Sequence, residues 1–180
     1  MKKKILILSS SPRKGGNSDT LCNQFIKGAT EAGHTTEKIY VHDKKIGFCK
    51  ACYACKDDGI CIQKDDMTII LDKMIDADVI VLSTPVYFYA MNGQMKTLID
   101  RTLPRYYTDV KISDKDFYFI ATAAEKTDAM QRTIDGLHGF TDCLPGANVK
   151  GIICGATAWQ LGDIEGNEAM QEAFDVGKQI

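Results

Sequence analysis

Short strand-like runs alternate with segments of helical periodicity along the whole chain, and this alternation restricts the fold more than any other feature. The runs occupy residues 5–8, 36–41, 79–82, 117–121 and 149–153. Between and after them, apolar residues recur every three or four positions, which predicts helices over 17–32, 67–74, 94–103, 128–143 and 165–177. Short, mostly apolar strands of this kind are typical of parallel sheets that helices cover on both sides.

We therefore expect an α/β three-layer sandwich, with a five-stranded parallel sheet of order 2-1-3-4-5 and helices on both faces. With 180 residues, no internal repeat and no linker, residues 1–180 are expected to form a single domain. Residues 43–66 are a cysteine-bearing insertion loop in this scheme. Such sheets bind ligands beyond the carboxyl ends of their strands, so the informative residues should follow Leu8, Leu82 and Ile120.

The charge and the N-terminal segment argue against two classes of partner. A net charge of -2 and a pI of about 5.9 give no basic surface for nucleic acid. The first apolar run has four residues, which is too short for a signal peptide or a membrane span. We expect a cytoplasmic protein that binds neither nucleic acid nor membrane.

The loop after the first strand, residues 9–20, reads SSSPRKGGNSDT and leads directly into a helix. Hydroxyl groups and glycines at a helix N-terminus gather backbone N–H donors at the positive end of the helix dipole, and Arg13 and Lys14 add positive charge. The loop lacks the Walker A order, the G-x-G-x-x-G order and the nucleophilic cysteine of a low-molecular-weight phosphatase. It favours a mononucleotide phosphate that is held and not cleaved. An ordinary capped turn is the alternative.

Four of the seven cysteines share one segment with the spacing C-x2-C-x2-C-x5-C: Cys49, Cys52, Cys55 and Cys61. Without a secretory signal, such a group indicates metal or redox chemistry before a structural disulfide. Thiolates at successive short spacings suit an iron–sulfur cubane, whereas structural zinc usually uses two separated pairs. Free thiols, a labile disulfide and zinc remain alternatives to a cluster. The scattered cysteines, Cys22, Cys143 and Cys154, are expected to be small buried hydrophobes.

Together these segments resemble the NAD(P)H-dependent FMN reductases of the flavodoxin-like superfamily, especially their iron–sulfur flavoprotein relatives. The resemblance rests on the loop at 10–18, on the segment STPVYF at 83–88 with the helix that follows, and on the cysteine segment. It covers nearly the whole chain. It implies a flavodoxin-like fold, non-covalent FMN, NAD(P)H as co-substrate and a [4Fe–4S] cluster held by the four cysteines.

The resemblance also implies the site residues. The FMN phosphate would contact the first loop, through Ser11, Arg13, Lys14, Asn17 and Ser18. The flavin ring would contact the second and third loops, through Pro85, Val86, Tyr87 and Phe88, with Asn92, Gly93, Ala123 and Ala124 close by. Three consecutive aromatic residues in one short loop cannot all face a core, so at least one should cover a ligand or pack against another subunit. Lys96, Asp100 and Arg101 are expected to form structural ion pairs.

The expected function is FMN-dependent oxidoreduction, in which NAD(P)H supplies the electrons that reduce a flavin, a quinone or a similar small-molecule acceptor. No catalytic side chain is required, because the flavin carries the chemistry. The alternative is an iron–sulfur flavoprotein that exchanges electrons with a redox protein such as ferredoxin without catalysing a reaction. A cysteine-based redox sensor is a third hypothesis. The resemblance implies a homodimer or homotetramer.

Overall fold

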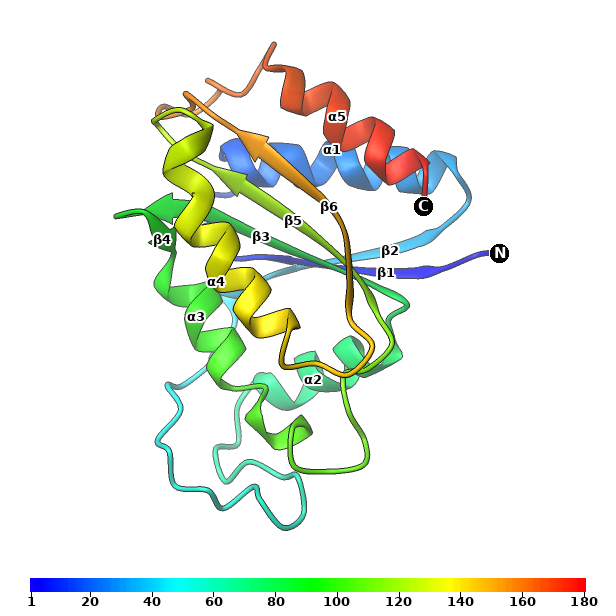
Figure 1. The fold of residues 1–180 in the computed structure, drawn as a ribbon, viewed down its shortest axis with the longest axis vertical. Helices are drawn as coiled ribbons and strands as arrows, with labels where there is room; N and C mark the ends of the chain where they lie inside the picture. The colour runs from blue at the N-terminus through cyan, green and yellow to red at the C-terminus, as the bar shows by residue number, and fades with distance from the viewer.

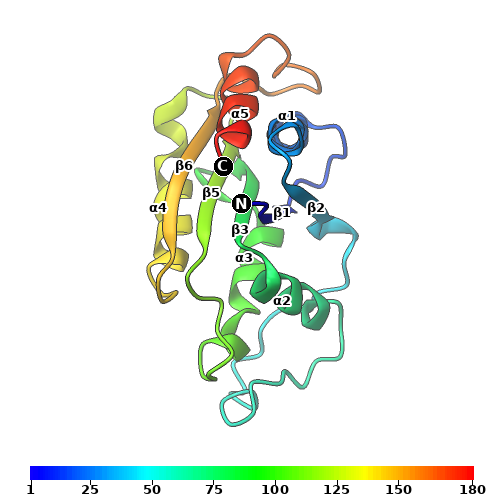
Figure 2. The ribbon, with the colours of Figure 1, turned by 90° about the vertical axis from the view of Figure 1, so that its right-hand side faces the viewer.

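The computed structural model describes all of residues 1–180 and contains one sheet between two layers of helices (Figures 1 and 2). Five of its strands are parallel: β1 (Lys4–Ser9), β2 (Thr35–Tyr40), β3 (Val79–Tyr87), β5 (Asp116–Thr122) and β6 (Asn148–Gly155). They lie in the order β2-β1-β3-β5-β6. This confirms the predicted order, which is 2-1-3-4-5 when the five parallel strands are numbered alone.

The third strand is longer than predicted, and a sixth strand follows it. The apolar run in the sequence ends at Leu82, but β3 continues through Pro85 to Tyr87 and pairs there with the antiparallel strand β4 (Ala90–Met91). β1 pairs with β3 only as far as Ser83, whereas Pro85 pairs with Thr122 of β5. Pro85 therefore lies where the main sheet borders β3 on one side only, and a residue without an N–H is tolerated at such a position.

The helices divide between the two faces of the sheet (Figure 2). One layer contains α1 (Asn17–Glu31) and α5 (Glu168–Lys178), and the other contains α2 (Met67–Asp76), α3 (Gly93–Asp100) and α4 (Gln131–Thr141). α1 and α5 approach so closely at Gly28 that an added Cβ would collide with the carbonyl oxygen of Phe174. Three short 3-10 turns complete the fold: η1 (Val41–Asp43), η2 (Leu103–Arg105) and η3 (Thr127–Met130). None of the helices has the length and apolar content that a membrane crossing requires.

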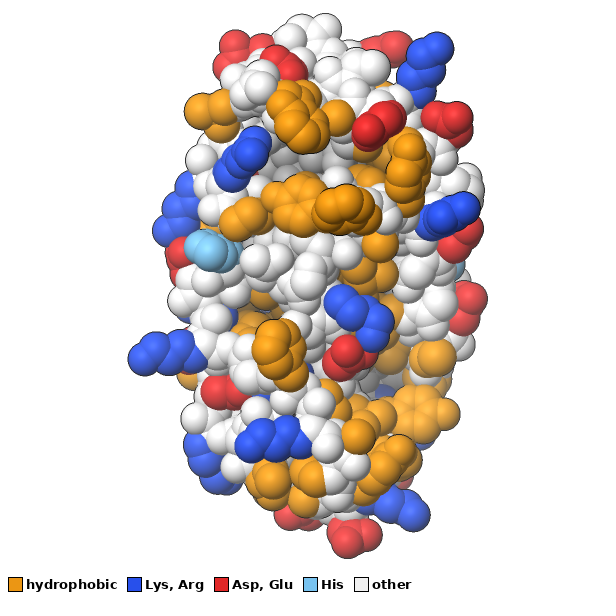
Figure 3. Space-filling model, turned by 90° about the vertical axis from the view of Figure 1, so that its left-hand side faces the viewer, with side chains coloured by type: hydrophobic (Ala, Val, Ile, Leu, Met, Phe, Trp, Pro, Cys, Tyr) orange, Lys and Arg blue, Asp and Glu red, His pale blue; other side chains and the backbone are white.

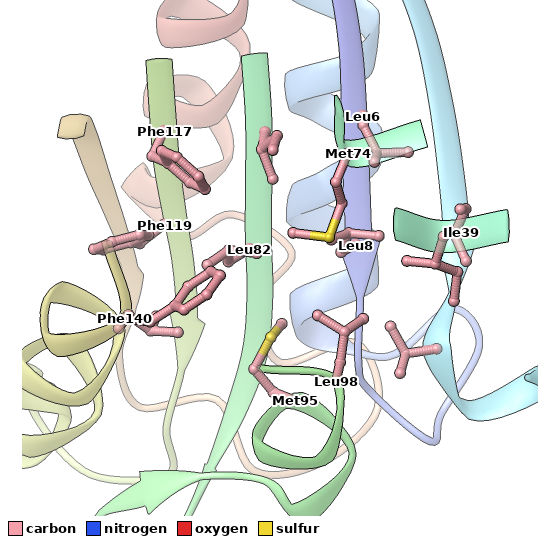
Figure 4. Close-up of a cluster of buried hydrophobic side chains, with 14 of the residues drawn as sticks. Leu6, Leu8, Ile39, Met74, Leu82, Met95, Leu98, Phe117, Phe119 and Phe140 are labelled. Atoms are coloured by element: carbon pink, nitrogen blue, oxygen red, sulfur yellow. The ribbon is translucent and has the colours of Figure 1, made fainter. Parts of the chain in front are cut away.

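Alternate side chains of the central strands enter the two helix layers. Leu6, Leu8 and Leu82 pack against the layer of α2, α3 and α4, as Figure 4 shows. Ile5 and Ile7 pack against α1 and α5. Burial of each such side chain contributes about 1.5–3 kcal/mol. Because both faces of the sheet are packed in this way, the strands appear in the sequence as short apolar runs. The loop residues beyond the carboxyl ends of the strands take no part in this packing.

Residues 44–66, between η1 and α2, contain no helix or strand and form the loop at the bottom of Figure 1. The two ends of this loop are joined to each other. The Lys45 N–H donates to Asp66 Oδ2 at 2.7 Å, and the Gly47 N–H donates to Asp65 Oδ2 at 2.9 Å. The cysteine segment is therefore a loop whose two ends are hydrogen-bonded to each other.

Candidate functional site

A cavity of about 550 Å³ opens at the carboxyl ends of the central strands. Its walls come from the loops after β1, β3, β5 and β6. Figure 3 views the molecule from the left-hand side of Figure 1, where β3 ends and β4 lies, and hydrophobic side chains gather across the upper half of that face. Nine of the 17 lining residues are hydrophobic, and five of the other eight lie in the segment between β1 and the first turn of α1, at 11–18. The cavity therefore suits a ligand with an apolar part and a polar end.

The polar end of the cavity is the start of α1. Gly16 occupies the N-cap position and no side chain caps the helix. The backbone amides of Asn17 and Ser18, which line the cavity, have no hydrogen-bond acceptor within the chain. Free N–H groups at the positive end of a helix dipole bind anions. A phosphate here would supply the missing acceptors, so this loop fits the phosphate of a mononucleotide.

A buried carboxylate behind the loop shapes it. Asp19 is 1% exposed and accepts hydrogen bonds from the Gly15 N–H at 2.8 Å, Lys38 Nζ at 2.7 Å and the Tyr40 hydroxyl at 3.1 Å. Burial by itself lowers the pKa of Lys38, but the bonds to Asp19 and Tyr40 outweigh it and raise that pKa. Lys38 therefore stays charged and balances Asp19. The left-handed turn at Gly15 (φ 69) is held by this carboxylate with no ligand required.

The apolar end of the cavity lies between the second and third loops. Pro85, Val86 and Tyr87 form one side along the end of β3, and Ala123 and Ala124 lie in the loop that follows β5. The small side chains of the third loop allow a ligand to approach its backbone. A flat ring system between these loops would have apolar contacts on its faces and backbone groups along its edge.

Ten of the thirteen residues predicted to bind the cofactor line this cavity: Ser11, Arg13, Asn17, Ser18, Pro85, Val86, Tyr87, Phe88, Ala123 and Ala124. The other three lie outside it. Lys14 pairs with Asp43 at 2.6 Å, and Gly93 lines a neighbouring cavity. Asn92 is buried beneath the second loop, where its side-chain oxygen accepts from the Met95 N–H at 3.1 Å and caps α3.

The cavity also contains residues that the sequence analysis did not assign. Most are neighbours of predicted ones: Gly16, Tyr89, Thr122 and Glu125. Ala158, Trp159 and Leu161 form a fourth wall, from the loop after β6. That loop carries no recognisable motif. The one residue of that loop that stands out in the sequence is Trp159, the only tryptophan of the chain. Its side chain is exposed in the structure.

All seven cysteines are free thiols. The four of the cysteine segment line one small hollow against the end of α3, with Cys55 buried, Cys61 half-buried and Cys49 and Cys52 exposed. Burial, together with the neighbouring thiols, raises the pKa of Cys55. No group of three or more histidine, cysteine, aspartate or glutamate side chains is arranged to hold a metal ion. The thiols share a site without converging on a point.

The scattered cysteines differ in part from expectation. Cys22 is fully buried, as predicted, but Cys143 is exposed and Cys154 is half-buried. Cys143 lies just beyond α4, where its thiol donates to the Gly139 carbonyl at 3.3 Å. Its side chain is not part of the hydrophobic core. The apolar residues around Cys143 in sequence therefore do not imply burial.

Arg101 joins the hollow to the base of the cysteine loop. Its side chain is 2% exposed and forms a two-bond ion pair with Asp65, at 2.6 and 2.9 Å. It also donates to the Gly47 carbonyl at 2.7 Å and to Cys61 Sγ at 3.5 Å, while its Nε has no partner. Lys96 pairs with Asp100 at 2.5 Å on the same helix. Structural ion pairs, as expected from the sequence, thus account for these three residues.

Comparison with known proteins identifies the chain. The sequence profile of the NADPH-dependent FMN reductase family matches residues 3–153. The chain belongs to this family. Membership confirms the resemblance and the predicted class, an FMN-dependent oxidoreductase that takes electrons from NAD(P)H.

Among proteins similar to this FMN reductase family member are two named iron–sulfur flavoproteins. One, from Methanosarcina thermophila, is 29% identical over 176 residues, which is 98% of this chain and 88% of that protein. The other, from Methanocaldococcus jannaschii, is 35% identical over 137 residues, 76% of this chain and 70% of that protein.

Solved structures support the flavodoxin-like fold. An NAD(P)H:quinone oxidoreductase from Methanothermobacter marburgensis is similar with a TM-score of 0.78 and 17% identity, over 99% of this chain and 96% of that one. An azoreductase from Bacillus anthracis has a TM-score of 0.77 and 15% identity over the full length of both chains.

Proposed function

We propose that the cavity at the strand ends binds FMN and that the chain uses NAD(P)H to reduce a small acceptor such as a flavin or a quinone. One observation carries the proposal: a single cavity has an uncapped helix N-terminus at one end and an apolar cleft between two loops at the other. FMN has a phosphate and a flat tricyclic ring at its two ends. Family membership supports the same ligand.

The phosphate end of FMN would be held by Ser11, Arg13, Asn17 and Ser18, which combine backbone N–H groups, hydroxyls and one positive charge. Lys14 would contribute only after exchanging Asp43 for the phosphate. Because the loop is already shaped by Asp19, little ordering is required when the ligand arrives.

The ring end would lie between Pro85, Val86, Tyr87 and Phe88 on one side and Ala123 and Ala124 on the other. Asn92 supports the second loop from beneath, and Gly93 follows it as the first residue of α3. When bound, FMN supplies hydride acceptance and donation. The side chains bind and orient the ring and exclude water, and none of them is required as a nucleophile or general base.

We also propose that Cys49, Cys52, Cys55 and Cys61 hold a [4Fe–4S] cluster. Four thiols on one hollow, beside a buried guanidinium, form a donor set that suits an anionic thiolate-bound group. Two relatives that are similar to this chain over 176 and 137 residues are named iron–sulfur flavoproteins. The exposed thiols of Cys49 and Cys52 must turn inward for all four to coordinate, and this segment has no regular structure to prevent it.

The second candidate function is electron transfer to a redox protein such as ferredoxin, without turnover of NAD(P)H. The observation that favours it is the position of the cysteine hollow, which lies at one end of α3 while the FMN cavity lies near the other. An eight-residue helix is about 12 Å long, so the hollow and the cavity lie near opposite ends of one short helix. A net charge of -2 offers no strongly acidic docking surface and favours the reductase.

The assembly and location that we propose are a homodimer or homotetramer of one-domain chains, 1–180, in the cytoplasm. Exposed aromatic side chains around the cavity mouth, at Tyr87, Phe88, Tyr89 and Trp159, support the contact between subunits. Light scattering on the purified protein tests the oligomeric state, and a monomer at micromolar concentration would contradict it.

Anaerobic purification followed by a visible spectrum and steady-state assays tests the function. Flavin bands with a broad shoulder to their short-wavelength side, together with iron and sulfide analysis, report the two cofactors. Oxidation of NADH or NADPH with menadione supports the reductase. Reduction by ferredoxin alone, with no pyridine-nucleotide turnover, would reject the reductase and support the carrier.

A further inference from the structure

We infer that Arg101 makes the iron–sulfur cluster easier to reduce, because its buried guanidinium donates hydrogen bonds to cysteine sulfur in the hollow. The inference rests on the proposed function, since it concerns the cluster that we place in the cysteine segment. It gives Arg101 a positioning and charge-balancing role in addition to its ion pair with Asp65, which secures the base of the loop.

The guanidinium of Arg101 has more donors than its ion pair uses. Nη1 and Nη2 each bind one carboxylate oxygen of Asp65, at 2.6 and 2.9 Å, and Nη1 also donates to the Gly47 carbonyl. On the edge that Nη2 shares with Nε, Nη2 reaches Cys61 Sγ at 3.5 Å, and Nε is buried without a partner. Because the five donors lie in one rigid plane, Nε cannot turn toward Asp65 while the other bonds remain.

A buried donor without an acceptor is destabilising, so a group that fills the hollow would satisfy the Nε of Arg101. The hollow lies at the end of α3 that is remote from the FMN cavity, beside the loop at the bottom of Figure 1. All four cysteines of the segment line it together with Arg101. Sulfur is therefore the acceptor that the lining brings to this edge of the guanidinium.

Arg101 is also the one buried charge of the hollow. The other charged lining residues are Lys50 and Asp100, which are both exposed, and Asp100 pairs with Lys96. α3 ends at Arg101, and the carbonyl end of a helix carries a partial negative charge that disfavours an anion. A permanently charged guanidinium at this position reverses that effect.

A positive charge at this position acts unequally on the two redox states. Reduction adds one electron to the thiolate-bound cluster, supplied by dithionite in the experiment below, and no bond forms or breaks. The negative charge beside Arg101 grows by one, so the attraction and the hydrogen bonds to sulfur become stronger. Net charge and hydrogen bonds to the sulfurs are among the factors that set the potential of such a cluster. Arg101 thus favours the reduced state, and the negative charge of Asp65 opposes it in part.

Two substitutions in the same ion pair should therefore have opposite effects. Arg101→Gln removes the cation. At a potential fixed by dithionite and a redox dye, the ratio of reduced to oxidised cluster should fall about 10-fold, which is about 59 mV for one electron. Asp65→Asn removes the opposing charge and keeps the guanidinium, so the ratio should rise at least about 3-fold. Arg101→Lys, which keeps the charge, should recover most of the wild-type ratio.

Electron paramagnetic resonance of the reduced cluster, on anaerobically purified protein, gives the ratio without any turnover of NAD(P)H. The matched control is Arg105→Gln, which removes the same charge further along the chain. Its guanidinium pairs with exposed Asp72 and does not line the hollow, so the ratio should stay at the wild-type value.

Three results would overturn the inference. They are an unchanged ratio in Arg101→Gln, a fall of equal size in Arg105→Gln, or a shift in the same direction in Arg101→Gln and Asp65→Asn. Equal loss of iron from the last two variants would also overturn it, because a purely structural ion pair predicts that outcome. Loss of iron from Arg101→Gln alone, with a raised ratio in Asp65→Asn, supports it.

Failure of the proposed cluster is visible in the wild type. After anaerobic purification and reconstitution with iron and sulfide, the wild-type protein would then hold no iron, and the inference would fall with the cluster. A wild type that holds iron, with an unchanged ratio in Arg101→Gln, rejects the role of Arg101 alone.

Discussion

The side-chain amide of Asn92 donates a 2.7 Å hydrogen bond to the backbone carbonyl of Ser10, and this bond joins the second loop of the cavity to the first. Both residues are buried, so water does not compete for the bond. Asn92 also caps α3 through the Met95 N–H. One side chain thus fixes the spacing between the phosphate end and the ring end of the cavity.

Asn92→Ala should therefore weaken both the fold and the binding of FMN. Loss of the cap and of a buried hydrogen bond is expected to cost about 1–3 kcal/mol of unfolding free energy, measured in urea. FMN affinity, measured by quenching of flavin fluorescence, should fall because the two loops are no longer held together. The matched control is Asn167→Ala, which removes the cap of α5. If both variants lost FMN affinity equally, the special role of Asn92 would be contradicted.

Arg101→Met should destabilise the cysteine segment, residues 44–66, far more than Arg105→Met does. Removing one partner of a buried ion pair costs about 3–5 kcal/mol. Asp65 would be left without its partner, so residues 44–66 should become sensitive to limited proteolysis. In the control, Arg105→Met, the partner Asp72 is largely exposed and the expected cost is about 0–1 kcal/mol. Equal proteolysis in the two variants would show that Arg101 does not secure the loop.

The same ion pair predicts a dependence on acid. Burial by itself raises the pKa of Asp65, but hydrogen bonds from Arg101 and from the Gly47 and Met67 amides outweigh it and hold the pKa below its ordinary value of 3.8. A carboxyl whose pKa is lowered by folding stabilises the fold above its unfolded pKa. That stabilisation is lost as the pH falls through the folded pKa. The cysteine segment should thus detach below about pH 4. Labelling of Cys55 by a pyridyl disulfide, followed against pH, should show this step.

Asp65→Asn provides the control for that step. Asparagine does not titrate in this range, so the variant should label Cys55 at a rate that does not rise as the pH falls below 4. A wild-type labelling rate that did not rise at any pH below 3.8 would contradict the role of Asp65.

The thiols should differ widely in reactivity in the native protein. Burial raises the pKa of Cys22 to about 12, so this thiol should remain unmodified by iodoacetamide at pH 8. The exposed thiols of Cys49, Cys52 and Cys143 should be alkylated first in the metal-free protein. Peptide mass spectrometry against time gives the order. Modification of Cys22 as fast as Cys143 without denaturant would show that α1 does not pack as described.

The sequence predicts the sheet and the first two loops because the signals are local. Apolar periodicity within each run shows which residues are buried, and a hydroxyl-rich and glycine-rich turn before a helix indicates an anion site. The extension of β3 through Pro85 was missed because it depends on where β1 ends. The cavity wall around Trp159 was missed because no local sequence pattern shows that the loop after β6 lies beside Asn17. The pairing of Arg101 with Asp65 likewise depends on topology, over 36 positions of sequence.

The central claim is that the start of α1 holds a phosphate while the loop after β3 shelters the flavin ring. Calorimetric titration of flavin-free protein with FMN and with riboflavin, which lacks the phosphate, tests it most directly. We predict micromolar or tighter binding of FMN and at least about 100-fold weaker binding of riboflavin, the difference expected for losing several charge-assisted hydrogen bonds. Equal affinity for the two flavins, or no binding of FMN, would contradict the account.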